Sequence, residues 1–266
     1  MPVNFHDPAL ARTYSDRDAD PTWTEVFGRL VDPRGLRAVD LGCGGGTYSR
    51  ALLRLGAAHV VGVDSSAPIL DAARADAPVG LDLVRADVGA TGLPTGAADL
   101  VLSRAVVHHL ADLDAFAREA HRLLVPGGHL VVQDRTPDDV DEPAGPDNLR
   151  GYLLEAFPRL RAVETGRRAD AATLTQALRR NGFDPVTTSS LHEVRRVHAS
   201  VGAYTAELRA RTGRSILHEL DDAELDGFCA TLHATLPPGP VVERDRWTLW
   251  HALRPADPQQ PPAVPR

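Results

Sequence analysis

Short apolar runs alternate with amphipathic runs along the first half of the chain. The apolar runs predict strands near 37–41, 59–64, 81–86, 98–103 and 128–134. The amphipathic runs predict helices near 46–55, 67–75 and 112–124, with stop signals at Gly56 and at Pro126-Gly127-Gly128. Strands that are apolar on both faces and alternate with helices are typical of a parallel sheet covered on both sides. The pattern therefore predicts an α/β fold.

The segments outside this core differ from it in composition. Residues 1–35 are polar and interrupted by four prolines, with one helical pattern over 23–30. Residues 135–170 carry acids, prolines and aromatics, and residues 200–236 have a largely helical pattern. We interpret these two segments as insertions that form a cap, near 135–170 and 200–240, within a main domain spanning 36–254. The proline-rich tail, 255–266, is expected to be disordered.

Two more strands are predicted beyond the first five. Residues 183–191 read as a strand that follows a helical pattern over 174–180, and residues 246–253 alternate as a strand does. About 50 residues separate the two strands. That separation is longer than a hairpin loop, so it predicts a helical insert between them.

The most informative motif lies between the first strand and the first helix. Asp40-Leu41-Gly42-Cys43-Gly44-Gly45-Gly46 is a glycine-rich turn in which the backbone can approach a ligand closely. A strand, a glycine turn and a helix in this order predict a nucleotide-binding loop. A dinucleotide loop would place glycine or alanine where Thr47 stands, and the Asp40 carboxylate would repel a pyrophosphate. The motif instead suits S-adenosylmethionine, which carries an ammonium and a sulfonium and no phosphate.

A second anchor is Asp64, which ends the predicted second strand 22 residues after Gly42. An acid about 20 residues past a glycine turn accepts hydrogen bonds from ribose hydroxyls. Asp87, Ser103 and Asp134 also stand at or beside predicted strand ends. Ligands of α/β folds bind at the carboxyl ends of the strands, so we expect these polar groups to converge there.

Taken in order, these motifs resemble the class I S-adenosylmethionine-dependent methyltransferases, in particular the broad bacterial small-molecule group with His-His-Leu after the fourth strand. The matching stretches are 39–46, 61–64, 85–87 with 92–94, 99–103, 108–110 and 119–128. The resemblance covers residues 36–134. It implies a Rossmann-like seven-stranded, mostly parallel sheet with helices on both faces, an antiparallel pair of edge strands, a largely helical cap and S-adenosylmethionine as the cofactor.

The resemblance also implies which residues hold the cofactor. These are Tyr14, Arg17, Asp40, Gly42, Cys43, Gly44, Gly46, Asp64, Ser65, Asp87, Val88, Ser103 and Arg104. The N-terminal segment often folds over the cofactor in this family, so we expect residues 1–35 to act as a lid with Tyr14 and Arg17 near the methionine carboxylate. The alternative for this segment is a solvated leader. Cys43 is expected to be chosen for its small size rather than as a reactive thiol.

The candidate catalytic residues are His108, His109, Asp134 and Arg135. Methyl transfer needs positioning and, for a hydroxyl acceptor, a general base. Histidine titrates near neutral pH, which makes His109 a candidate base and His108 a candidate substrate contact. The alternative is a structural role for both histidines. Asp134 and Arg135 would either hold a polar substrate or neutralise each other.

Three residues of the expected cap are candidates for lining the acceptor site, and packing is the alternative for each of them: Tyr152, Glu155 and Phe157. The neighbouring acidic run at 138–142 is interpreted as a solvated loop, so no metal is predicted. The stretch Ser103-Arg104-Ala105-Val106 departs from the motif of the amino-group methyltransferases that act on nucleic acids and proteins. We therefore expect a small-molecule acceptor.

Composition narrows the functional classes further. The net charge of −7 argues against binding to nucleic acid or to an anionic membrane surface. All 29 basic residues are arginine, which excludes a lysine Schiff base. No apolar run approaches 18 residues and no signal peptide is evident, so a cytoplasmic location is expected. Two cysteines, Cys43 and Cys229, do not make a disulfide framework.

Three functions stay open on the sequence alone. The favoured one is methyl transfer from S-adenosylmethionine to a small molecule. A cyclase or binding protein that holds the cofactor without transferring its methyl group would carry the same motifs. An NAD-linked oxidoreductase is disfavoured by Asp40 and Thr47. The acceptor, its reacting atom and the oligomeric state do not follow from the sequence.

Overall fold

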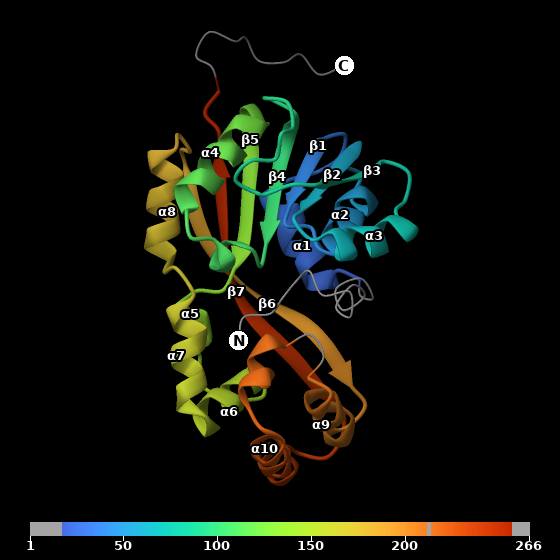
Figure 1. Ribbon diagram of the computed structural model, residues 1–266, viewed down its shortest axis with the longest axis vertical. Helices are drawn as coiled ribbons and strands as arrows, with labels where there is room; N and C mark the ends of the chain where they lie inside the picture. Colours follow the sequence, from blue (N-terminus) through green and yellow to red (C-terminus); the bar gives the residue numbers. More distant parts are fainter. Residues whose placement is uncertain (1–17, 212–213, 257–266) are drawn as a thin grey trace.

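A single seven-stranded sheet forms the centre of the computed structural model, which describes residues 18–211 and 214–256 (Figure 1). Its strands are β1 Arg37–Leu41, β2 His59–Asp64, β3 Leu81–Arg85, β4 Ala98–Arg104, β5 Leu124–Asp134, β6 Val186–His198 and β7 Val241–Leu253. The strand order is β3-β2-β1-β4-β5-β7-β6. Strands β1 to β5 pair in parallel, and β7 runs antiparallel to both β5 and β6. The predicted Rossmann-like, mostly parallel sheet with an antiparallel edge pair is confirmed.

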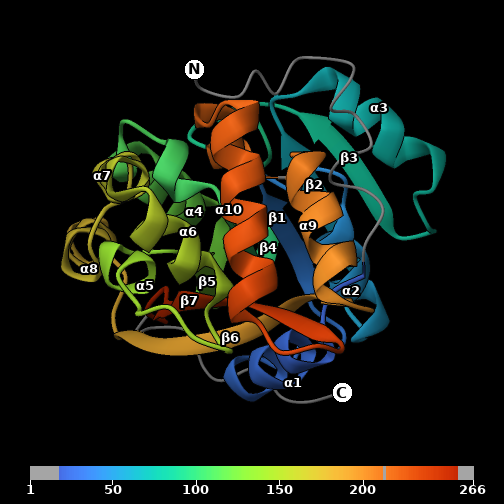
Figure 2. The same ribbon diagram turned by 90° about the horizontal axis from the view of Figure 1, so that it is seen from below.

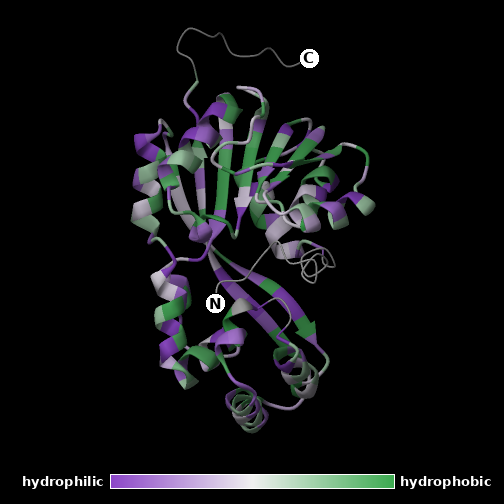
Figure 3. Cartoon of the chain, viewed as in Figure 1, coloured by the Kyte–Doolittle hydropathy of each residue, from purple (hydrophilic) through white to green (hydrophobic). Residues whose placement is uncertain are grey.

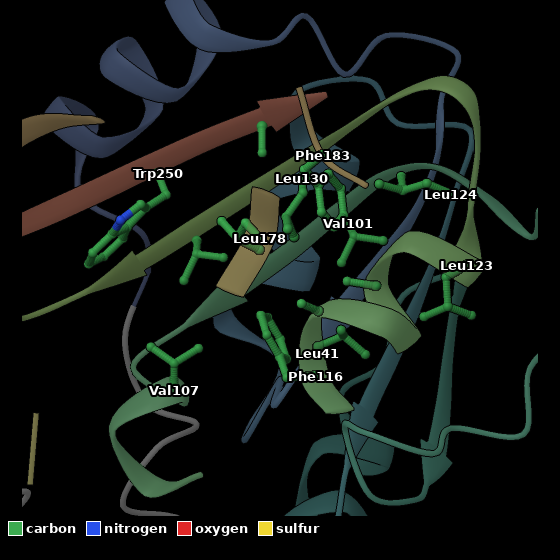
Figure 4. Packing of buried hydrophobic residues seen from close by; sticks show 14 of the residues in the cluster. Leu41, Val101, Val107, Phe116, Leu123, Leu124, Leu130, Leu178, Phe183 and Trp250 are labelled. Carbon is green, nitrogen blue, oxygen red and sulfur yellow. The ribbon is translucent and has the colours of Figure 1, made fainter. Parts of the chain in front are cut away.

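Successive side chains of a strand point to opposite faces of the sheet, and helices cover both faces. In β1, Ala38 joins the core cluster that contains Trp23 and Phe27 of helix α1. Its neighbour Val39 joins the cluster that contains Phe116 of helix α4, shown in Figure 4. The helices that flank the sheet are α1 Pro21–Leu30, α2 Thr47–Arg54, α3 Ala67–Ala75, α4 Leu113–Leu123 and α8 Ala171–Arg180.

Below the carboxyl ends of the strands lies a second group of helices, which we call the distal lobe (Figure 1). It consists of α5 Pro137–Val140, α6 Leu149–Ala156, α7 Pro158–Gly166, α9 Val201–Arg209, the 3₁₀ helix η3 Ser215–Glu219, α10 Asp222–Thr235 and the ends of β6 and β7 that extend past the sheet. The two inserted segments share one apolar core. Leu153 and Leu160 from the first segment pack in the same cluster as Leu217 and Phe228 from the second.

The distal lobe faces the end of the sheet where ligands of this fold class bind. Seen from below, α9 and α10 project across β1, β2 and β4 (Figure 2). The upper parts of the paired edge strands lie beside the apolar strands of the sheet. The lower part of β7, which extends past the sheet, is hydrophilic (Figure 3). The junction between sheet and lobe is therefore polar, and it contains most of the buried charges described below.

The structure differs from the sequence predictions at several boundaries. Strand β6 starts at Val186 rather than 183, because Phe183 is buried against the ring of His121 and Pro185 has no amide proton to donate. Both edge strands are longer than predicted because they pair with each other beyond the sheet. Three helices occupy the segment 135–170, which the pattern did not resolve into elements. Among the described residues no helix is long and apolar enough to cross a membrane.

Candidate functional site

A cavity of about 380 Å³ opens at the carboxyl ends of β1, β2 and β4. Ten of the residues predicted from the sequence line it: Asp40, Gly42, Cys43, Gly44, Asp64, Ser65, Asp87, Val88, Arg104 and His109. These residues come from separate motifs along about 70 residues of sequence. Their convergence on one cavity is what the strand-end rule for α/β folds predicts.

The glycine turn shapes one wall of the cavity. Gly42, Gly44 and Gly46 have φ values of 77°, 52° and 78°, in the left-handed region that favours glycine. A Cβ atom on Gly42 would lie 2.2 Å from Cγ2 of Val106. Gly46 does not line the cavity but is the N-cap of α2, where no side chain caps the helix. The start of α2 is thus capped by a glycine, which has no side chain to offer the first amide groups of the helix.

Asp64 ties the end of β2 to this turn. Its Oδ2 accepts a hydrogen bond from the amide of Gly44 at 2.9 Å, and its Oδ1 accepts one from the amide of Ser66 at 2.9 Å. Each carboxylate oxygen keeps a further lone pair for a ligand, since a carboxylate has about four acceptor positions. Asp87 is held similarly by the amide of Gly89 at 2.7 Å.

Asp40 is buried beneath the turn with an exposed fraction of 2%. Burial raises the pKa of its carboxyl to about 6, although the hydroxyl of Ser49, at 2.6 Å from Oδ2, favours the ionised form. Cys43 is also buried, and burial together with the charges of Asp40 and Asp64 raises the pKa of its thiol. A thiol that stays protonated supports the interpretation that Cys43 is there for its size.

The end of β4 contributes Arg104 and not the neighbouring serine. The Arg104 guanidinium lies 4.2 Å from the ring centre of Tyr48 and 4.4 Å from that of Trp247, and it pairs with Glu193 at 2.7 Å. Ser103 is fully buried, and its hydroxyl donates to the carbonyl of Leu41 at 3.1 Å. The Ser103 hydroxyl therefore joins β4 to β1 and is not free for the predicted contact with the cofactor.

The two histidines occupy different positions beside the cavity. Nδ1 of His108 lies 2.8 Å from Oδ1 of the buried Asp134, and the His108 amide donates to the same carboxylate at 3.3 Å. Burial alone would raise the pKa of Asp134, but the hydrogen bond from His108 lowers it below its usual value. The rings of His108 and His109 are 3.9 Å apart. Desolvation, followed by the charge of His108, lowers the pKa of His109 to about 4.

Arg135 points away from the cavity lining. Its Nη2 donates to the carbonyl of Asp139 at 3.1 Å, and its Nη1 is 3.8 Å from Oδ1 of Asp245. Asp134 contacts His108 and the Arg135 amide rather than the Arg135 guanidinium. The suggestion that Asp134 and Arg135 neutralise each other is therefore wrong, because the Arg135 guanidinium contacts Asp139 and Asp245 while the Asp134 carboxylate contacts His108.

The predicted cap residues fall outside the cavity lining. Tyr14 and Arg17 lie outside the described residues. Tyr152 and Phe157 pack against the core of the distal lobe, and Glu155 accepts a hydrogen bond from the amide of Ala144. Their positions support the packing alternative.

Sequence reasoning also missed part of the lining: Gly45, Thr47, Tyr48, Ile69, Ala105, Val106 and Leu110. Val106 and Leu110 flank the predicted histidines, so proximity to a motif could have indicated them. Ala105 has a φ of 57°, a conformation that alanine rarely adopts, and nothing in the sequence signals it. Aliphatic side chains such as Ile69 carry no pattern that distinguishes a ligand contact from core packing.

Among the described residues, one histidine–carboxylate group has the spacing of a metal site. The ligand atoms of His198, Glu207 and Glu243 all lie within 4.8 Å of one another. Arg214 contacts both carboxylates, and Arg196 contacts that of Glu207. A divalent cation would have to displace these arginines, so the donor set does not fit a metal.

Comparison with known proteins identifies the segment that builds this cavity. Residues 39–132 match the family described as "Methyltransferase domain". A trans-aconitate 2-methyltransferase from Acidovorax sp. (strain JS42) is 35% identical over 139 residues, which are 52% of each chain. A ubiquinone biosynthesis O-methyltransferase from Chelativorans sp. (strain BNC1) is 40% identical over 116 residues, 40% of this chain and 44% of that protein. The chain spans about half the length of the curated relatives it matches.

A solved structure extends the likeness to most of the chain. The S-adenosylmethionine-dependent methyltransferase from Mesorhizobium loti is 26% identical, with a TM-score of 0.51, over 87% of this chain and 97% of that one. The matched family segment ends at residue 132, before Asp134 and before the distal lobe begins. All the residues that line the cavity therefore lie within the matched family segment, and no helix of the distal lobe does.

Val106 leaves no room for a side chain at position 42. We expect Gly42→Ala to lower the free energy of unfolding by about 1–3 kcal/mol from overpacking, plus about 1 kcal/mol for a left-handed alanine. Adding Val106→Ala removes the Cγ2 atom and should recover the overpacking part only. Urea denaturation of the single and double variants measures both parts. Equal stability of wild type and Gly42→Ala would show that a side chain at position 42 does not overlap Val106.

Proposed function

We propose that this chain, whose residues 39–132 form a methyltransferase domain of the class I S-adenosylmethionine-dependent type, transfers a methyl group from S-adenosylmethionine to a small-molecule acceptor. The observation that carries the proposal is the cavity at the ends of β1, β2 and β4, where the glycine turn meets Asp40, Asp64 and Asp87. Three acids around a turn suit a cationic ligand and oppose a phosphate. The net charge of −7 supports an acceptor other than nucleic acid or a membrane.

Each part of the cavity wall supports a part of the cofactor. Asp64 would accept hydrogen bonds from the ribose hydroxyls, since both its oxygens are held in place by the amides of Gly44 and Ser66. Val88, Ile69 and Leu110 would enclose the adenine. The uncapped start of α2 would favour the methionine carboxylate, as helix N-termini favour anions. The cofactor itself supplies the electrophilic methyl group on its sulfonium.

The acceptor would approach from the side of the distal lobe. The cavity extends from the glycine turn to Arg104, Ala105 and His109, which follow β4 and face that lobe. We therefore propose that the insertions near 135–170 and 200–240 act as a cap within the domain 36–254, and that residues 1–35 act as a lid through Tyr14 and Arg17. Segments added to an α/β core commonly carry its specificity.

Asp134 and His108 would serve an acceptor that must lose a proton. Because Nδ1 of His108 donates to the Asp134 carboxylate, a neutral His108 keeps its lone pair on Nε2. This arrangement of a base with an orienting carboxylate recurs in general-base catalysis. His109, with its pKa lowered to about 4, is neutral at pH 7 and holds an abstracted proton weakly.

Two measurements test the proposed function. Calorimetric titration should show binding of S-adenosylmethionine and S-adenosylhomocysteine and no binding of NAD. Incubation with labelled S-adenosylmethionine and pooled small metabolites should then give a labelled product. Cofactor binding without any labelled product would favour the binding-protein or cyclase alternative, and binding of NAD alone would overturn the cofactor assignment.

We expect Asp64→Ala to weaken S-adenosylmethionine binding by about 2–3 kcal/mol, since hydrogen bonds to a charged acceptor are lost. Asp82→Ala is the matched control, because Asp82 lies on the adjacent strand β3 and its carboxylate contacts only the exposed His59 among the described residues. Calorimetry measures both variants. Unchanged affinity in Asp64→Ala would exclude the ribose contact.

The raised pKa of Asp40 predicts a pH dependence. A positively charged ligand prefers the ionised carboxylate, so affinity should rise by about tenfold between pH 5 and pH 7 as Asp40 titrates near 6. The stability of the ligand-free protein should depend on pH in the opposite direction. Because the pKa of Asp40 is raised in the folded state, protonation of its carboxyl stabilises the fold, and this stabilisation is lost as the pH rises through 6. Titration of S-adenosylmethionine into wild type and Asp40→Asn at both pH values tests whether Asp40 causes this pH dependence. An identical pH slope in the variant would assign the titration to another group.

A further inference from the structure

Four buried or half-buried arginines meet where the sheet joins the distal lobe. We call them the junction arginines: Arg135 follows β5, Arg150 lies in α6, and Arg167 and Arg168 follow α7. The side chains of Arg135 and Arg168 are each 4% exposed. This concentration of guanidinium groups is unusual for a protein interior, where an uncompensated charge is costly.

The junction arginines carry more charge than their partners offset. Within the part of the chain that the structure describes, they have two carboxylates within ion-pair distance, those of Glu164 and Asp245. The carboxylate of Glu164 pairs with Arg150, Arg167 and Arg168. The carboxylate of Asp245 lies 3.8 Å from Arg135 and 3.4 Å from Arg150. Four positive groups therefore share two negative ones.

Several donor atoms of the junction arginines also lack a hydrogen-bond partner among the described residues. These atoms are Nε and Nη1 of Arg135, Nε of Arg167 and Nε of Arg168. Burial, followed for Arg135 by the charge of Arg150, lowers the pKa values of Arg135 and Arg168 to about 10. Donors left without acceptors in a region of excess positive charge are the condition that a bound anion relieves.

The junction arginines are not among the residues that line the cavity, but two of them act electrostatically on His109 and on Asp134 at its β4 and β5 side. Arg168 lies close enough to act electrostatically on Asp134, the partner of His108. The charges of Arg167 and Arg168 also reach His109 and help to lower its pKa. His109 lines the cavity, so the positive groups are next to the end opposite the acidic glycine turn.

We propose that the junction arginines bind an oxyanion group, carboxylate or phosphate, of the methyl acceptor. This inference rests on the proposed function, because it assigns a chemical class to the acceptor of that reaction. The planar guanidinium fork matches both oxyanions through paired hydrogen bonds. One phosphate dianion or two carboxylates would offset the excess of positive charge.

The test uses the full chain saturated with S-adenosylhomocysteine. Succinate, inorganic phosphate and uncharged succinamide are titrated into it by calorimetry at constant ionic strength. We expect succinate or phosphate to bind and succinamide not to bind, and the better of the two anions identifies the source. Failure of S-adenosylhomocysteine to bind at the outset would count against the proposed function, whereas cofactor binding without anion binding would overturn the present inference alone.

Variants locate the site. Arg168→Gln should weaken binding of the preferred anion by about tenfold or more, while Glu164 keeps Arg150 and Arg167 as partners and the fold is retained. Arg168→Lys restores the charge without the fork and should recover part of the affinity. Arg214→Gln is the matched control, since Arg214 is 5% exposed and paired with Glu207 and Glu243. Equal anion affinity in folded Arg168→Gln and Arg214→Gln would overturn the assignment.

Discussion

The cavity rim at the end of β4 is held in place by the buried carboxylate of Glu193 on β6. This group accepts hydrogen bonds from the hydroxyl of Tyr48, the guanidinium of Arg104 and the amide of Gln133. Gln133 in turn accepts one from the indole of Trp23. A buried charge is tolerated only when its hydrogen bonds are complete, so each donor is confined to one place. Arg104 is thereby fixed at the rim of the cavity, between two aromatic rings.

Charge is segregated along the cavity that this arrangement frames. Acids lie at the glycine turn, where Asp40 and Asp64 belong to the ends of β1 and β2. The junction arginines lie at the other side, beyond His109. Under the proposed function, a cationic donor and an anionic acceptor would each meet the opposite charge, and they would attract each other across a partly desolvated space. The two ends of the site would then discriminate donor from acceptor by charge before shape contributes.

Much of the sheet and of the cofactor wall could be predicted because the signals are local. The strand over 59–64 and the helix over 67–75 have the predicted bounds, since apolar periodicity and a Ser66 cap specify them within the segment itself. The turn around Gly42 could be predicted because positive φ values demand glycine. Asp64 could be predicted because its spacing from the turn reflects one strand–helix–strand unit.

The distal lobe could not be predicted because its core forms between segments that are far apart in the sequence. Leu153 of α6 and Phe228 of α10 pack in one cluster, and neither segment alone shows which face is buried. Arg104 was predicted from the sequence as a cofactor-binding residue, but its contacts could not be predicted, since its partners Glu193 and Trp247 lie on the edge strands. Arg135 was assigned from its place beside Asp134, whereas the two side chains have separate partners, His108 for Asp134 and Asp139 for Arg135.

Strands β6 and β7 pass from the sheet into the distal lobe without interruption. Each is 13 residues long, and their pairing continues to His198 and Val241. A hydrogen-bonded ribbon of this kind resists sliding and yields mainly by twisting, because sliding would break its whole ladder at once. The lobe is therefore joined to the sheet by a ribbon that deforms elastically by twisting, rather than by a free hinge. Access to the cavity would follow the elastic twist of that ribbon, and its stiffness would help to set how quickly a ligand leaves.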